Sequence, residues 1–146
     1  MIDMQKIDFK KPAVLERLIG FTIPRDGKFA ICDHDEVWSA FMDTTRLPEV
    51  AEIHPYKFVE GNNDFLGLVF EGLGENQPIK RVGSTEIAWA FDPKSDFVTV
   101  HVRVGLEVDK VEFRTFSGDW FAASLSDDGQ YLVIAEPYDI GVYRIA

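Results

Sequence analysis

The sequence predicts a mainly β fold, with about nine or ten antiparallel strands in a sandwich, a rolled sheet or an open barrel. Two observations support this prediction. Several runs alternate between apolar and polar residues, and clusters of Asp, Asn, Gly, Ser and Pro separate the runs at short intervals. A chain of 146 residues, 46% of them hydrophobic, has the length and apolar content of one domain with a conventional core. We therefore expect a single β-rich domain over residues 1–146.

One helix is predicted near the N-terminus, over residues 12–19. Pro12 suits the first turn of a helix, and Gly20 is placed to end it in a left-handed conformation. The apolar residues that recur on one face of this segment are Val14, Leu15, Leu18 and Ile19. Such a helix would cover one face or edge of the sheet.

Three further runs are expected to form strands. Phe65–Phe70 and Tyr131–Ala135 are apolar on both faces, which is typical of strands that are covered on both sides. Thr85–Phe91 has large residues, among them Trp89, on one face and alanines on the other. The small side chains would allow close packing on that second face.

The clearest strand is Phe97–Val104, in which four valines share one face and polar residues share the other. Val111–Phe116 alternates in the same way. If these two strands pair, Arg103 and Glu112 are expected to be cross-strand neighbours on a solvated face.

Two predicted hairpins begin with the same pattern, an Asp-Gly turn followed by one residue and then an aromatic side chain. The pattern occurs at residues 26–29 and again at residues 128–131. It resembles the inner hairpin of a β-propeller blade, as seen in WD-type repeats. A propeller typically needs at least about four blades of about 40–45 residues. The resemblance therefore implies blade-like hairpins within a smaller β fold.

The strongest functional feature is a concentration of negative charge between residues 33 and 75. This window holds ten carboxylates against two basic residues, and the whole chain has a formal net charge of −10. A surface of that sign repels phosphate groups, so we expect no binding to nucleic acid or to an anionic membrane. The same field would speed encounters with a basic protein. A role in solubility alone is the competing interpretation.

The densest group of reactive residue types is the run from Cys32 to Glu36. On a continuous strand, Cys32, His34 and Glu36 would share one face, which is the kind of arrangement used by a nucleophile and its base. The local interpretation is a solvated hairpin tip, since Asp and His suit such turns. Metal binding around His34 is a third interpretation, although the spacings of common zinc and calcium sites are missing. We predict neither a metal nor another cofactor.

We expect a non-catalytic domain that presents its acidic surface to a basic protein partner. In its size, its acidity and its lack of a catalytic motif the chain resembles bacterial immunity proteins, which cover the active site of a toxin. Interfaces of this kind place aromatic anchors inside a polar rim. The predicted binding residues are Asp33, Asp35, Glu36, Trp38, Glu49, Glu52, Tyr56 and Glu60.

Two other functions remain open at this level. A small-molecule-binding or hydrolytic domain would use an aromatic pocket around Trp89 and Phe91. A β module that completes an oligomeric or propeller-like assembly would use the blade-like hairpins, and the sequence does not predict the oligomeric state. The single cysteine, Cys32, permits no internal disulfide, and we see no signal-peptide pattern. The expected location is therefore the cytoplasm.

Overall fold

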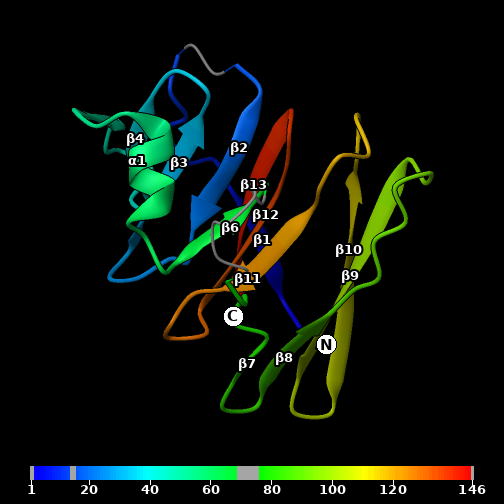
Figure 1. Cartoon of the computed structure of the whole chain (residues 1–146). Coiled ribbons are helices and arrows are strands. Elements are labelled where there is room, and N and C mark those ends of the chain that lie inside the picture. The colour runs from blue at the N-terminus through cyan, green and yellow to red at the C-terminus, as the bar shows by residue number, and fades with distance from the viewer. Residues whose placement is uncertain (1, 14–15, 69–75, 146) are drawn as a thin grey trace.

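The computed structural model describes residues 2–13, 16–68 and 76–145. These residues form thirteen strands in three antiparallel sheets and one short helix, so the mainly β class is confirmed. The three sheets lie one beside the next, and the middle sheet contains both the first and the last strand (Figure 1). The strand number exceeds the predicted nine or ten, partly because three strands have only two or three residues.

The first sheet, called here the helix-covered sheet, has five strands in the order β5-β4-β3-β2-β6. Its strands are β2 (Leu18–Thr22), β3 (Lys28–Asp33), β4 (Val37–Phe41), β5 (Glu49–Ala51) and β6 (Phe65–Gly67). Helix α1 (Pro55–Glu60) lies against one face of this sheet, where Val59 packs in a core cluster with Ile19 and Cys32. The hairpin predicted to begin at residues 26–29, with its tip within residues 32–36, is present as β3 and β4.

The open sheet lies at the opposite end of the molecule and has the order β10-β9-β8-β7. Its strands are β7 (Arg81–Val82), β8 (Thr85–Ala88), β9 (Phe97–Val104) and β10 (Glu107–Arg114). The predicted strand Phe97–Val104 coincides with β9. The expected pair of Arg103 and Glu112 is wrong, because the short turn at Gly105 places Arg103 opposite Val108 and Glu112 opposite Thr99.

The central sheet has the order β1-β13-β12-β11. Its strands are β1 (Met4–Ile7), β11 (Ala122–Leu125), β12 (Tyr131–Glu136) and β13 (Asp139–Ile145). The N-terminal strand pairs with the C-terminal one, with Met4 opposite Ile145 and Ile7 opposite Val142. The two ends of the chain are thus held in one sheet.

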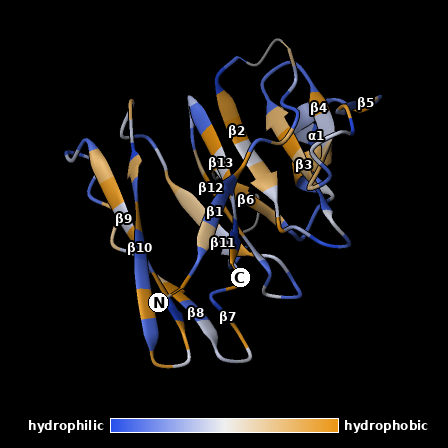
Figure 2. Ribbon diagram, turned by 180° about the vertical axis from the view of Figure 1, so that it is seen from behind, coloured by the Kyte–Doolittle hydropathy of each residue, from blue (hydrophilic) through white to orange (hydrophobic). Residues whose placement is uncertain are grey.

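The core has two main clusters, one on each side of the central sheet. Strand β12 supplies both of them, because successive side chains of a strand point to opposite faces. Val133 packs with Phe21 and Ile31 of the helix-covered sheet, whereas Ile134 packs with Val100 of the open sheet. Figure 2 shows hydrophobic residues on the strands that face one another across these clusters. This explains why residues 131–135 are apolar on both faces, as the sequence predicted.

The predicted N-terminal helix over residues 12–19 is wrong. Its described residues are not helical, the last two belong to β2, and Val14 and Leu15 lie outside the described residues. All of β2 is buried, since Ile19 packs toward α1 while Leu18 and Phe21 pack toward the central sheet. A short apolar run buried on both faces has no strand-like alternation, so it can imitate the apolar face of a helix.

Both Asp-Gly patterns form hairpin turns, although the first has two residues in the left-handed region and the second has one. Asp26 and Gly27 join β2 to β3, and Asp128 and Gly129 join β11 to β12. The backbone φ angles of Asp26, Gly27 and Gly129 are +53°, +71° and +75°. Left-handed conformations of this kind favour Gly and Asp in tight hairpins. Each turn belongs to the first hairpin of its sheet along the chain, which is β2–β3 in the helix-covered sheet and β11–β12 in the central sheet.

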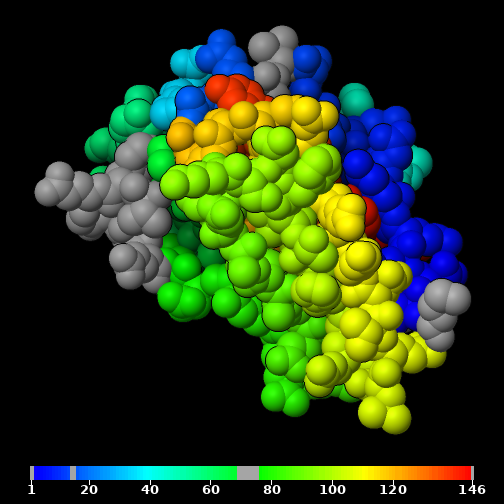
Figure 3. Space-filling view, turned by 90° about the vertical axis from the view of Figure 1, so that its right-hand side faces the viewer, coloured from blue at the N-terminus to red at the C-terminus, as the bar shows by residue number. Residues whose placement is uncertain are grey.

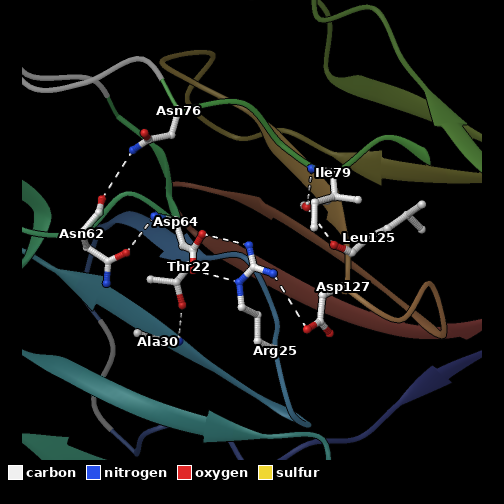
Figure 4. Close-up of polar contacts among 10 residues, drawn as sticks. Thr22, Arg25, Ala30, Asn62, Asp64, Asn76, Ile79, Leu125 and Asp127 are labelled. Carbon is white, nitrogen blue, oxygen red and sulfur yellow. Dashed lines mark hydrogen bonds and ion pairs between the residues drawn. The ribbon is translucent and has the colours of Figure 1, made fainter. Parts of the chain in front are cut away.

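Polar contacts tie the sheets to one another (Figure 4). The guanidinium of Arg25 donates to both carboxylate oxygens of Asp64, at 3.0 and 3.1 Å, and lies 3.8 Å from Asp127 near the end of β11. The Asp64 carboxylate raises the Arg25 pKa further above its ordinary value. Ile79 also bonds to β11, because its N–H donates to Ser124 Oγ and its carbonyl accepts from the Leu125 N–H.

Candidate functional site

The turn between β3 and β4 is organised by a buried carboxylate. Oδ1 of Asp33 accepts the backbone N–H groups of Asp35 and Glu36, at 2.7 and 2.8 Å. Oδ2 accepts the N–H of Glu16 at 3.2 Å, although the two residues are 17 positions apart. Because Asp33 is almost fully buried, it anchors the turn and the segment that precedes β2 rather than presenting charge to solvent.

These contacts leave a groove of about 450 Å³ between Pro12, Ala13 and Glu16 on one side and β3, β4 and β5 with their connecting turn on the other. We call it the acidic groove. Its lining residues are Pro12, Ala13, Glu16, Asp33, Asp35, Glu36, Trp38 and Val50. Four of the eight residues predicted from the sequence therefore line one groove, and none of the lining residues described is basic.

Two carboxyl groups meet inside the acidic groove. The side chain of Glu16 is hydrogen-bonded to Asp35, and this contact, together with repulsion from Asp35 and Asp33, raises the pKa of Glu16 above its ordinary value. His34 opposes the shift. When two carboxylates are in contact, their repulsion favours protonation of one of them. A cation placed between them instead stabilises both ionised groups.

The wall of the groove at β5 is apolar. Trp38 and Val50 are cross-strand neighbours on the same face, with Trp38 mostly buried and Val50 exposed at 59%. Three more large apolar side chains near β5 are exposed in the same stretch of chain: Leu47, Ile53 and Tyr56. An apolar border of this kind beside charged groups is typical of protein interfaces.

The other four predicted residues do not line the groove. Glu49 lies opposite Ser39, on the other face of β5 from Val50, and its carboxylate pairs with Arg46 at 3.2 Å. Glu52 is exposed just after β5, and Glu60 is exposed at the end of α1.

Tyr56, the fourth of these residues, lies beside the turn between β3 and β4. Its hydroxyl is 3.3 Å from His34 Nδ1, and its ring contacts the ring of His54. His54 also begins α1, because its Nδ1 accepts the Tyr56 N–H. Helix α1 therefore joins the loop after β5 to the turn that holds Asp35 and Glu36.

The remaining carboxylates between residues 33 and 75 are dispersed. Asp43 is held by the N–H and hydroxyl of Thr45, and Asp64 is paired with Arg25 at the other end of β2. Glu71 and Glu75 lie outside the described residues. The window thus contributes one groove and several separate turns rather than a single continuous acidic face.

The catalytic interpretation of residues 32–36 finds little support in the geometry. Cys32 is buried, and burial, with a smaller effect of Asp33, raises the pKa of its thiol to about 12, so the nucleophilic thiolate is disfavoured. In the described part of the chain, no group of three or more His, Cys, Asp or Glu residues is arranged to hold a metal ion. The described helix is also too short to cross a membrane.

The aromatic residues proposed for a small-molecule pocket pack against one another. The ring of Phe121 stacks on Phe91 at 5.9 Å and meets the edge of Trp89 at 6.0 Å. Lys80 lies over the Trp89 ring with its ammonium 4.8 Å from the ring centre. These contacts join β8 and its following loop to the central sheet, away from the acidic groove.

Glu16 is the one carboxylate among the described groove residues that the sequence did not indicate. The sequence placed it inside a helix, and its neighbours in the groove are contributed by a hairpin 17 or more positions away. No local pattern reports such a contact. Comparisons of this chain with protein-family models, with curated proteins and with solved structures found no match.

Proposed function

We propose that this chain is a non-catalytic protein-binding domain whose acidic groove receives a basic side chain of a partner protein. The observation that carries the proposal is the meeting of Glu16, Asp35 and Glu36 in one groove of about 450 Å³. Carboxylates brought together in this way attract a cation more strongly than the same charges dispersed over a surface.

An arginine side chain fits the chemistry of the groove best. Its planar guanidinium has five N–H donors and can bond two carboxyl groups at once. Its positive charge beside Glu16 would offset the repulsion from Asp35 and Asp33 that raises the Glu16 pKa, so binding would lower that pKa. The methylene stem of the arginine would pack along the apolar wall formed by Trp38 and Val50.

The exposed apolar residues near β5 supply the second part of the proposed interface. Leu47, Val50, Ile53 and Tyr56 are all exposed beside the acidic groove or in the chain that leads from it. In protein interfaces a few central anchors, most often aromatic ones such as tyrosine, cost about 2 kcal/mol or more of binding free energy when truncated. A basic partner with an apolar patch, such as a toxin held by an immunity-type inhibitor, would match both parts. The proposal includes a cytoplasmic site of action.

The test is affinity capture from the cells of origin, followed by measurement of association rates at two salt concentrations. The groove variant is Glu16→Gln with Asp35→Asn, and the control is Asp3→Asn with Asp96→Asn, which removes the same charge at exposed positions outside the groove. We expect the wild type and the control to capture a basic protein whose association slows as salt increases. Equal loss of binding in both variants, or binding insensitive to salt, would contradict a groove-specific interface.

A second candidate function, a β module within a larger assembly, is favoured by the strand order. Each sheet contains a four-stranded meander, and in the central sheet β1 supplies the fourth strand to β11–β13. This order is the one expected of blade-like units. However, neither the outer face of the helix-covered sheet nor that of the open sheet is suited to stacking against a further blade. Helix α1 covers one of them, and Thr99, His101 and Arg103 lie on the outward face of the other.

A further inference from the structure

We propose that β10 is a dimerisation edge, and that two copies of this chain pair their β10 strands antiparallel to form one continuous eight-stranded sheet. β10 spans eight residues and is paired on one side only, with β9, among the strands described. An exposed edge of that length is a template for another strand. This inference is independent of the acidic groove, which lies on another sheet.

The backbone groups available for pairing belong to the even-numbered residues of β10. The N–H of Thr115, just after the strand, donates to the Asp96 carbonyl on the β9 side. Because directions alternate along a strand, the N–H groups of Val108, Lys110, Glu112 and Arg114 point away from β9. Consistent with this, the Lys110 N–H bonds to the Asp109 carboxylate, at 2.7 Å, instead of to β9.

Charge makes this edge suitable for a second copy of the same chain. Residues 97–114 carry three basic and three acidic side chains, so the β9–β10 hairpin is formally neutral although the chain has a net charge of −10. Two copies can approach here with less repulsion than at the acidic surface. Figure 3 views the outer face of the open sheet, where the yellow atoms of β10 reach the lower border of the molecule.

Among the registers that overlap most of β10, the side chains favour one. Pairing centred on Val111 places Lys110 opposite Glu112 of the second copy twice, by symmetry, and overlaps residues 108–114. A register centred on Lys110 would oppose two lysines, and one centred on Glu112 would oppose two glutamates. Within one chain, Lys110 Nζ already lies 3.5 Å from Glu112 Oε1, so the dimer would carry a cluster of four charges in which each Lys110 has a Glu112 from each copy as its neighbour. In that register Arg114 lies opposite the exposed Val108 of the second copy.

The inner face of the proposed pair contains Val111 at the symmetry axis and Asp109 opposite Phe113. The Asp109 carboxylate would release the Lys110 N–H, which would then donate to the carbonyl of Glu112 in the second copy. An interface made by one strand from each copy is small compared with the roughly 1,200–2,000 Å² of stable complexes. The dimer is therefore expected to form reversibly and only at high protein concentration.

Light scattering after size exclusion, over a range of protein concentrations, tests the proposal. We expect the wild type to rise from 16.6 kDa to twice that mass as the concentration increases. Lys110→Glu and Glu112→Lys should each remain monomeric, because each opposes like charges across the axis, and the two substitutions together should restore the dimer. Lys57→Glu, an exposed change of the same charge on α1, is the control and should dimerise like the wild type.

Hydrogen exchange at high concentration provides the second measurement. The amides of Val108, Glu112 and Arg114 should exchange more slowly in the wild type than in Lys110→Glu, while the β9-facing amides of β10 should exchange equally in both. A wild-type protein that is monomeric at every concentration would overturn the proposal. So would a dimer that both single charge reversals leave intact.

Discussion

Gly20 of β2 and Gly67 of β6 lie opposite each other with their backbones in contact. A Cβ atom on Gly20 would lie 2.1 Å from the Leu66 carbonyl oxygen, and one on Gly67 would lie 2.6 Å from the Gly20 Cα. Any side chain at either position therefore overlaps the backbone of the neighbouring strand. The pairing of β2 with β6, which keeps α1 and Phe65 over the sheet, depends on two glycines that are 47 positions apart in the sequence.

Gly20→Ala and Gly67→Ala should each lower the free energy of unfolding by at least about 3 kcal/mol, at the upper end of overpacking effects. The measurement is urea unfolding followed by circular dichroism. Gly83→Ala is the matched control, since Gly83 has a φ of +57° but open space around it, so only backbone strain of about 1–2 kcal/mol applies. Equal losses in all three variants would show that close backbone contact is not the cause.

Asp33→Ala should destabilise the protein by about 3 kcal/mol, because it leaves three backbone N–H groups near the β3–β4 turn without their buried acceptor. Asp33→Asn retains one acceptor oxygen and should lose less. Unfolding in urea measures both losses. An Asp33→Ala variant as stable as the wild type would contradict the anchoring role of this carboxylate.

Glu16→Gln should stabilise the free protein near neutral pH, and this gain should shrink as the pH falls. The reason is the raised pKa of Glu16, which lets the folded state bind more protons than the unfolded state between the ordinary pKa and the raised one. The contribution of Glu16 to stability therefore decreases as the pH rises through that window. Urea unfolding at several pH values tests whether the gain in stability shrinks or grows as the pH falls. Asp3→Asn, which removes one negative charge at an exposed position outside the groove, is the control. A gain that grows toward acid pH would contradict the contact with Asp35.

Cys32 should not react with a thiol reagent at mildly alkaline pH until the protein opens. Its side chain is buried, and its pKa of about 12 keeps it protonated. The measurement is the rate of labelling with and without urea. Lys28→Cys in a Cys32→Ser background places a thiol at an exposed position of β3 and should label at once. Immediate labelling of native Cys32 would show that α1 does not cover this face in solution.

The fold class and many of the strands are local properties, so the sequence predicted them well. The alternation of valines over residues 97–104 coincides with β9, and the apolar run at 131–135 lies within β12, between two sheets. The Asp-Gly turns were also located correctly, because their backbone conformation depends on the turn residues themselves. These features needed no knowledge of distant parts of the chain.

The residues of the acidic groove were only partly predictable. Composition identified the concentration of carboxylates between residues 33 and 75, and the hairpin tip at Asp35 and Glu36 follows from local turn chemistry. That Glu16 joins them, that Asp33 is buried, and that Glu49 points to the other face of β5 are consequences of how the strands pair. Pairing depends on contacts between residues far apart in sequence, which no single segment encodes.

The sequence by itself determined that this chain is an acidic, mainly β protein with hairpins at its Asp-Gly turns, because alternation and turn chemistry act over a few residues. The tertiary structure decided that residues 18–22 form a strand rather than the end of a helix, since burial on both faces outweighs local helix propensity. It also decided which carboxylates meet in one groove and which strand is left at an edge, since both depend on the order in which the strands are joined.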